Sequence, residues 1–442
     1  MSALLRRLGG ATGGLALTTV GSTLVRLVNS LVLTRLLSPS VFGLAGIVSS
    51  IFFVIVMMTD LGFESYLIRH PQSNDQHFRN VLWTVHAWRG MLLMGLAMAA
   101  SPLVATALQK PELAMPLALA SATLGIGGFV SFSLIMSLRS GRSKKLSLMD
   151  LALTSFQTAL GIGLAVWLRN VWAIIGAMIG ASLLKTALSY AIFPDSSHRF
   201  ARNAEVNRDF FAFSKIVLAS SFVSLLISQS DKLFLARLLT LPQYGLYAVA
   251  LNLVSVPANF AASYVSRIVY PEYTRIWNAN PKGLAGLYYS VRQRTSLLFA
   301  FGTGALVGGA PLIVAVLYDA RYRGTGLYVT LLGIGAALRL PTYAAAEAMT
   351  AMGNIKVTLR ANIVRIVWLA VAGPIGFYLD GGTGIICAVG LCEVPALIYS
   401  WMELRKAEIL NMRYEMGYIV LFISGAVASY GVSRMGLAFF GR

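Results

Sequence analysis

The chain has 442 residues, of which 57% are hydrophobic and only 12% are charged. Soluble domains carry about 25% charged residues, so this composition excludes a water-soluble enzyme, a disordered chain and a nucleic-acid-binding protein. The net charge is +19, but the basic residues are spread between long apolar runs and form no clustered face for nucleic acid. We therefore expect an all-α polytopic membrane protein.

A membrane-spanning helix needs about 20 mainly apolar residues. Arg6 and Arg7 precede the first such run, but Arg26 lies inside it and no Ala-x-Ala site follows, so a retained helix is expected rather than a signal peptide. In chain order, the runs predict helices at 13–37, 42–69, 79–108, 113–139, 146–168, 170–193, 210–239, 242–270, 291–318, 325–352, 357–379, 382–404 and 414–440.

The basic residues between these helices indicate an orientation. With the N-terminus in the cytoplasm, 21 Lys and Arg fall on the inner side, Arg292 and Arg294 among them, and 8 fall on the outer side. Cytoplasmic loops carry an excess of Lys and Arg. The bias predicts a cytoplasmic N-terminus and, after thirteen helices, an outer C-terminus.

An internal repeat relates the two halves of the chain. The segment RLLSPSVFGL at 35–44 recurs as RLLTLPQYGL at 237–246, at a constant offset of 202 residues. Six predicted helices separate the copies, so both cross the membrane in the same direction. The repeat predicts two parallel six-helix lobes around a central cavity, with substrate bound between them. The expected divisions are a lobe at 1–209, a lobe at 210–404 and an extra transmembrane helix at 405–442.

The repeat-equivalent helices each carry a polar stripe. Both stripes follow steps of three, four and three residues, which places each set on one helix face. We expect the two stripes to line one cavity between the lobes. They consist of Thr19, Ser22, Arg26 and Asn29 in the first helix, and of Ser221, Ser224, Ser228 and Asp231 in the helix at 210–239.

Most charged residues inside the predicted spans are basic. Each costs about 2.5–3.5 kcal/mol near the bilayer centre and therefore faces protein or water. Arg carries a permanent charge on a planar fork that matches phosphate, so Arg26 and Arg339 are expected to hold a phosphate or pyrophosphate. Lys185 is given no role, because no polar stripe is assigned around it. The predicted cationic cavity contains Arg26, Arg89, Lys215, Arg339 and Arg365.

Internal ion pairing is the competing interpretation of these charges. Asp60 and Glu64 lie one turn apart, and either could neutralise Arg26 or Arg89. Glu347 follows Arg339 by eight residues on roughly the same face. The same three acids are candidates for ion coupling, with structural pairing favoured for Asp60 and Glu64.

Motifs for catalysis are missing from the sequence. It contains no P-loop and no Gly-x-Ser-x-Gly elbow, and its four His show no metal-ligand spacing. Cys387 and Cys392 lie in one apolar run and predict packing residues. We expect no catalytic residue, no bound metal and no cofactor beyond a coupling ion, which is either a proton or sodium.

Several segments carry a family resemblance. They are 35–44, DLGFESYLIR at 60–69, and the run from Asp231 through YGLYA at 244–248 to Pro271. These segments resemble Wzx-type flippases, the polysaccharide-transport branch of the multidrug/oligosaccharidyl-lipid/polysaccharide exporter superfamily. The resemblance implies two six-helix lobes around a cationic cavity. It also implies transport of an undecaprenyl-pyrophosphate-linked oligosaccharide to the outer leaflet by alternating access, for surface polysaccharide, lipopolysaccharide or exopolysaccharide synthesis.

The resemblance further implies a cellular localisation and partners. The expected localisation is the inner membrane of a bacterium, in contact with membrane lipid. The expected partners are the lipid-linked oligosaccharide, a polysaccharide polymerase and chain-length or export proteins, with no nucleic acid.

Three other functions remain as alternatives. A multidrug or small-metabolite antiporter of the same superfamily is the first, although a cationic drug would favour an acidic cavity. A membrane glycosyltransferase or polymerase would need a long outer loop, which the sequence lacks. An assembly scaffold would not need Arg inside its spans.

Overall fold

The computed structural model describes residues 11–193, 197–280 and 283–440, and these ranges contain helices and no strand. The predicted all-α class is therefore confirmed. The chain divides into two compact units, one ending at Arg237 and the other beginning at Leu238. The arrangement of these units as two parallel lobes stays a prediction.

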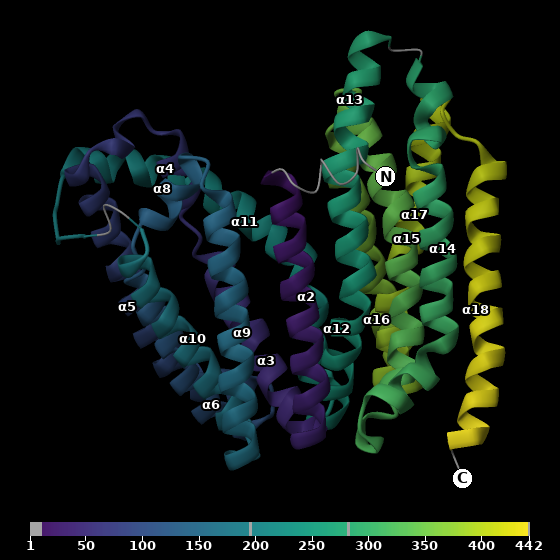
Figure 1. The fold of residues 1–442 in the computed structure, drawn as a ribbon, viewed down its shortest axis with the longest axis horizontal. Coiled ribbons are helices and arrows are strands. Elements are labelled where there is room, and N and C mark those ends of the chain that lie inside the picture. The colour runs from purple at the N-terminus through teal and green to yellow at the C-terminus, as the bar shows by residue number, and fades with distance from the viewer. Residues whose placement is uncertain (1–10, 194–196, 281–282, 441–442) are drawn as a thin grey trace. The chain divides into compact units, whose positions relative to one another are not determined.

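The first unit is the purple-to-teal part of Figure 1. Its aromatic core joins α4, α11 and the residue before α8. The ring centroid of Phe63 lies 5.7 Å from that of Phe132, the N-cap of α8, and 4.7 Å from that of Phe210. The helices are α2 (Ala11–Leu36), α3 (Pro39–Met58), α4 (Phe63–Arg69), α5 (Gln76–Ala107), α6 (Ala114–Ala120), α7 (Ala122–Gly128), α8 (Ser133–Arg139), α9 (Ser143–Leu168), α10 (Val171–Ala191) and α11 (Ala204–Leu238).

The internal repeat is a corner between two helices in both copies. Arg35 lies in the last turn of α2, and Pro39 occupies the first turn of α3. A proline there leaves no intrahelical bond unmade. Arg237 lies in the last turn of α11, and Thr240 forms a capping box with Gln243 at the start of the next helix.

The helix predicted at 42–69 is wrong as one continuous helix. It breaks between α3 and α4, where Gly62 has a φ of +74° that favours glycine. A Cβ at Gly62 would also lie 2.8 Å from Val217. The Asp60 carboxylate accepts the Gly62 N–H at 2.9 Å and stabilises this turn.

The helix predicted at 113–139 is also broken. It forms α6, α7 and α8, and the two parts Pro111–Gly128 and Ser133–Arg139 are bent by 58°. At Gly128 a Cβ would lie 2.9 Å from the Cα of Gly90, so two glycines allow α7 to approach α5 closely.

The second unit is the green-to-yellow part of Figure 1. The helix predicted at 242–270 continues through a π-helical turn, Val265–Val269, and ends only at Ala279. The unit contains α12 (Leu241–Tyr264), α13 (Tyr270–Ala279), α14 (Gly283–Leu317), α15 (Thr325–Ala351), α16 (Lys356–Gly390), α17 (Glu393–Lys406) and α18 (Met412–Phe440).

Helix α16 folds back on itself at Asp380 and Gly381, whose backbone is not helical. A Cβ at Gly384 would collide with the carbonyl of Gly376, and Trp368 donates its indole N–H to the carbonyl of Ala388 at 2.9 Å. The two segments are antiparallel, because residues progressively farther before the turn contact residues progressively farther after it. The turn predicted between the helices at 357–379 and 382–404 is confirmed, but the second helix is interrupted at Leu391 and Cys392, between α16 and α17.

The molecule is a multi-pass membrane protein. In the described ranges, nine helical stretches are long and apolar enough to cross a membrane, or ten if the bent pair 111–139 is one span. One of the nine, Lys356–Lys406, contains the hairpin of α16 and α17. Helices occupy all thirteen predicted ranges, but α2 and α11, which carry the polar stripes, do not meet this criterion.

Candidate functional site

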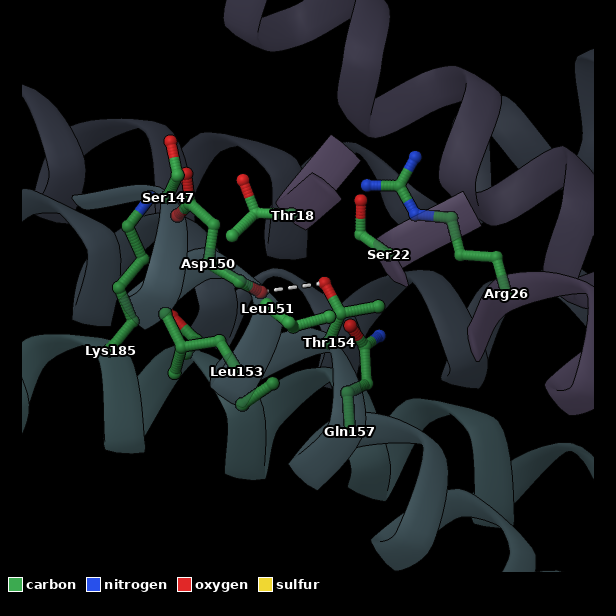
Figure 2. Close-up of a pocket in the computed structure, with 12 residues that line it drawn as sticks. Thr18, Ser22, Arg26, Ser147, Asp150, Leu151, Leu153, Thr154, Gln157 and Lys185 are labelled. Carbon is green, nitrogen blue, oxygen red and sulfur yellow. Dashed lines mark hydrogen bonds between the residues drawn. The ribbon is translucent and has the colours of Figure 1, made fainter. Parts of the chain in front are cut away.

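Part of the α2 stripe faces a cavity of about 530 Å³ inside the first unit. Figure 2 shows Ser22 and Arg26 on one side of this cavity, which we call the α2–α9–α10 pocket. Its volume lies within the range of about 300–1,000 Å³ that is usual for small-ligand sites. The lining residues are Thr18, Ser22, Arg26, Ser147, Asp150, Leu151, Leu153, Thr154, Gln157, Ala181, Ser182 and Lys185.

Helix α9 supplies a polar stripe that sequence analysis missed. Its members are spaced by three, four and three residues, the same steps as in α2, so they share one face. This spacing is visible in the sequence and could have identified the stripe. The members are Ser147, Asp150, Thr154 and Gln157.

Lys185 was also left without a role in the sequence analysis. It extends from α10 into the pocket, and Ser182, one turn earlier, lines the same pocket. Among the described residues, neither Arg26 nor Lys185 has a carboxylate within 4 Å. The described lining residues thus include two cations and one carboxylate, that of Asp150.

Asn29 of the α2 stripe is not among the described residues that line this pocket. Asn29 is half-buried, and its Oδ1 is a buried atom without a hydrogen-bond partner in the described part of the chain. The side chain of Thr19 lies outside the described residues.

The stripe of α11 is described only in part. The side chains of Ser224 and Ser228 lie outside the described residues, and Asp231 is half-buried. Lys215 is exposed on the same helix. The cavity shared by both stripes stays a prediction.

Arg89 binds the end of α3. Its Nη2 donates to Thr59 Oγ1 at 2.7 Å and to the Val56 carbonyl at 3.4 Å. The Asp60 carboxylate attracts the Arg89 guanidinium electrostatically. Glu64 is exposed in the first turn of α4. The contacts of Arg89 therefore hold α5 to α3.

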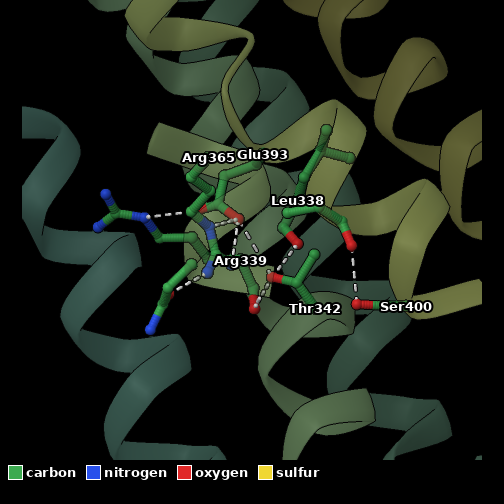
Figure 3. Close-up of polar contacts among 8 residues, drawn as sticks. Leu338, Arg339, Thr342, Arg365, Glu393 and Ser400 are labelled. Atoms are coloured by element: carbon green, nitrogen blue, oxygen red, sulfur yellow. Dashed lines mark hydrogen bonds and ion pairs between the residues drawn. The ribbon is translucent and has the colours of Figure 1, made fainter. Parts of the chain in front are cut away.

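A second charged cluster lies in the other unit and joins α15, α16 and α17 (Figure 3). Glu393 is 4% exposed, and its Oε2 accepts bonds from Arg365 Nη2 at 2.8 Å and Nε at 3.1 Å. Arg339 Nε lies 3.6 Å from Glu393 Oε1. Thr342 Oγ1 donates to Glu393 Oε2 at 3.4 Å. One carboxylate thus faces two guanidinium groups.

The two arginine side chains of this cluster differ in solvent exposure. The Arg365 side chain is 15% exposed, whereas that of Arg339 is 41% exposed. The carboxylate beside Arg339 is that of Glu393, which was not among the expected site residues, rather than that of the half-buried Glu347. Arg339 is therefore the more accessible of the two arginines.

Arg292, which the sequence prediction counted among the basic residues of the inner side, is buried in the structure. Arg292 lies in α14 and forms a 2.9 Å ion pair with Glu415 of α18, with both side chains at most 4% exposed. Its guanidinium also lies 4.8 Å from the ring centre of Tyr288 and 5.2 Å from that of Tyr289. No local pattern in the sequence predicts this contact, because the partners are 123 residues apart.

Comparisons with known proteins agree with this architecture. The model of a family described as polysaccharide biosynthesis protein matches residues 32–325. The chain is 24% identical to the succinoglycan biosynthesis transport protein ExoT of Rhizobium meliloti, over 89% of this chain and 79% of that protein. It is 21% identical to the lipopolysaccharide biosynthesis protein WzxC of Escherichia coli, over 90% of this chain and 80% of that protein. The fold is similar to that of the lipid II flippase MurJ in an inward closed conformation, with a TM-score of 0.69, 14% identity and coverage of 97% and 99%.

Proposed function

Because the chain belongs to the polysaccharide biosynthesis protein family, we propose that it is a flippase for a lipid-linked oligosaccharide. It moves this substrate from the cytoplasmic to the outer leaflet by alternating access, for surface or exopolysaccharide synthesis. The lipid carrier in this proposal is undecaprenyl pyrophosphate. The names of the relatives, which are a succinoglycan transport protein and a lipopolysaccharide biosynthesis protein, support this substrate class.

One observation of the molecule carries the proposal. Arg26 lines a large polar pocket within a bundle of apolar helices, and no carboxylate of the described residues lies within 4 Å of it. A guanidinium in that setting is suited to bind phosphate through two parallel hydrogen bonds. Arg339, which is partly exposed beside Glu393, offers a second such group.

The same charge pattern disfavours a multidrug antiporter. A cationic drug is attracted by an acidic site, whereas the described lining of the α2–α9–α10 pocket carries two cations and one carboxylate. An anionic head group complements that balance.

The proposed function also specifies the membrane in which the chain lies, its orientation there and the proteins that receive the substrate. We place the chain in the bacterial inner membrane with its N-terminus in the cytoplasm, and the basic bias supports this even without the buried Arg292. A proton or sodium gradient drives transport, and Asp60, Glu64 and Glu347 are the candidate coupling acids. A polysaccharide polymerase and export proteins receive the flipped substrate, and the chain itself catalyses no reaction.

A gene deletion with lipid analysis tests the proposed function. In the deletion strain, lipid-linked repeat units should accumulate in the cytoplasmic leaflet, measured as glycan that a membrane-impermeant oxidant reaches in inverted vesicles but not in spheroplasts. The wild-type chain should restore outward display, and Arg26→Ala at equal protein level should not. Normal outward display in the deletion strain, with only polymerisation lost, would contradict the proposal.

A further inference from the structure

The charges of the α2–α9–α10 pocket follow an order along its length. Figure 2 shows Arg26 at one end and Lys185 at the other, with Asp150, Thr154 and Gln157 between them. The three middle residues belong to one face of α9. A ligand that matches this pocket has an anionic group at each end and a polar, uncharged segment between the ends.

The middle of the pocket is suited to sugar hydroxyl groups. Gln157 offers an amide donor and acceptor, Asp150 offers carboxylate acceptors, and Ser147 adds a hydroxyl. No aromatic residue is among the described lining residues, so the wall binds through hydrogen bonds rather than through ring stacking. A hydroxyl-rich glycan satisfies these groups, whereas an apolar ligand would leave them unpaired.

One cation is enough for the phosphate end of a glycosyl phosphate. Arg26 binds the phosphate in the proposed function. If the sugar is neutral, the ligand offers no anionic group that Lys185 could bind. A lysine within a membrane-spanning helix is costly unless it has a partner or faces water. Among the described residues, no carboxylate lies within 4 Å of Lys185, although Asp150 lines the same pocket.

We propose that the α2–α9–α10 pocket binds the sugar next to the phosphate, and that Lys185 binds an anionic substituent on that sugar. The substrate is then an acidic oligosaccharide, and Lys185 determines the preference for it. This inference rests on the proposed function and adds the chemical class of the glycan.

Binding of three sugar phosphates to the full-length protein in nanodiscs tests the inference. The probes are glucose 1-phosphate, glucuronic acid 1-phosphate, which adds a carboxylate, and glucose 1,6-bisphosphate, which adds a phosphate. Measured by calorimetry at constant ionic strength, both acidic probes should bind about tenfold more tightly than glucose 1-phosphate, as expected for one added charge-assisted hydrogen bond.

Variants assign that preference to a residue. Lys185→Gln should bind all three probes with the affinity of glucose 1-phosphate, and Lys185→Arg should restore the preference, which separates lost charge from misfolding. Arg26→Gln should weaken all three probes to a similar degree. Lys144→Gln removes an exposed lysine of α9 that does not line the pocket, and it should bind like the wild type.

Three results would overturn the inference. They are equal affinity of the wild type for neutral and acidic probes, a preference that survives Lys185→Gln, and no binding of any probe at millimolar concentration. A chain that fails in this way but still restores outward display in the deletion strain retains the proposed function, so the two failures can be told apart. If an acidic probe binds more tightly only when the addition is a carboxylate, the substituent is a uronic acid rather than a phosphate.

Discussion

At the scale of single residues, burial separates charges that stabilise the fold from charges that solvent or a ligand can reach. Arg292 and Arg365 each hold a buried carboxylate, whereas Arg26, Lys185 and part of Arg339 stay accessible. Removing one partner of a buried pair leaves an uncompensated charge, which is far more costly than losing an exposed pair. The two kinds of charge should therefore respond differently to substitution.

The neighbours Arg365 and Arg339 provide a direct test of that difference. Arg365→Gln should lower the free energy of unfolding by about 3–5 kcal/mol, because Glu393 stays buried with a weaker partner. Arg339→Gln should cost less than about 1 kcal/mol and yet reduce transport, since its side chain is 41% exposed. Chemical unfolding of the purified variants and outward display at equal protein level measure the two effects. Equal unfolding energies for the two variants would contradict this division.

His198, which lies between α10 and α11, predicts a pH dependence of stability. Burial, with a smaller effect of Arg79, lowers the pKa of His198 from 6.5 to about 4. Its Nε2 accepts the Phe132 N–H at 3.1 Å, a bond that the protonated ring cannot make. The unfolded imidazole takes up a proton below pH 6.5 while the folded one does not, so stability should fall as pH drops from about 6.5 to about 4.

Melting temperatures of the purified protein across that pH range measure the effect. His198→Asn should have a flatter profile than the wild type, although its melting temperature at pH 7 is lower because its contacts are lost. His77→Asn changes an exposed histidine and serves as the control. A wild-type slope that persists in His198→Asn would assign the dependence to other groups.

At the scale of helices, small residues decide which pairs pack closely. Helix α18 lies along α14 in Figure 1, and a Cβ at Gly308 of α14 would collide with the carbonyl oxygen of Ala426 in α18. Close approach through small residues replaces the hydrophobic effect as the source of helix association in a membrane. The buried Arg292–Glu415 pair joins the same two helices.

Gly308→Val should therefore separate α18 from α14. We expect a destabilisation of about 1–3 kcal/mol, as for other overpacked sites, and faster proteolysis of the C-terminal helix in detergent. Gly302→Val lies on the same helix, where nothing is within 4 Å of an added Cβ, and should leave both properties unchanged. Similar proteolysis of the two variants would show that the α14–α18 contact is not what holds α18.

At the scale of the whole molecule, the fold-back of α16 decides how many times the chain crosses the membrane. The segment Lys356–Leu379 has 24 residues and is about 36 Å long, which exceeds the hydrocarbon thickness of about 30 Å. We therefore expect the chain to cross once before Asp380 and again before Glu408.

Labelling of single cysteines tests this topology in a background that lacks Cys387 and Cys392. Asn354→Cys and Glu408→Cys should react from the cytoplasmic side, and Asp380→Cys should react from the outside. A reporter at Arg442 should then lie outside, because α18 crosses once more. Reaction of Asp380→Cys from the same side as Asn354→Cys would mean that the hairpin does not span the membrane.

The sequence by itself determined the membrane class, the positions of the helices and the stripe of α2, because apolar length and helical spacing are local properties. It also contained the α9 stripe, which follows the same spacing. Only the tertiary structure decided which charges meet, since Glu393 lies 54 residues from Arg339 and Glu415 lies 123 residues from Arg292. Spacing along one helix places a residue on a face, but the packing of other helices decides whether that face is buried, paired or open to a ligand.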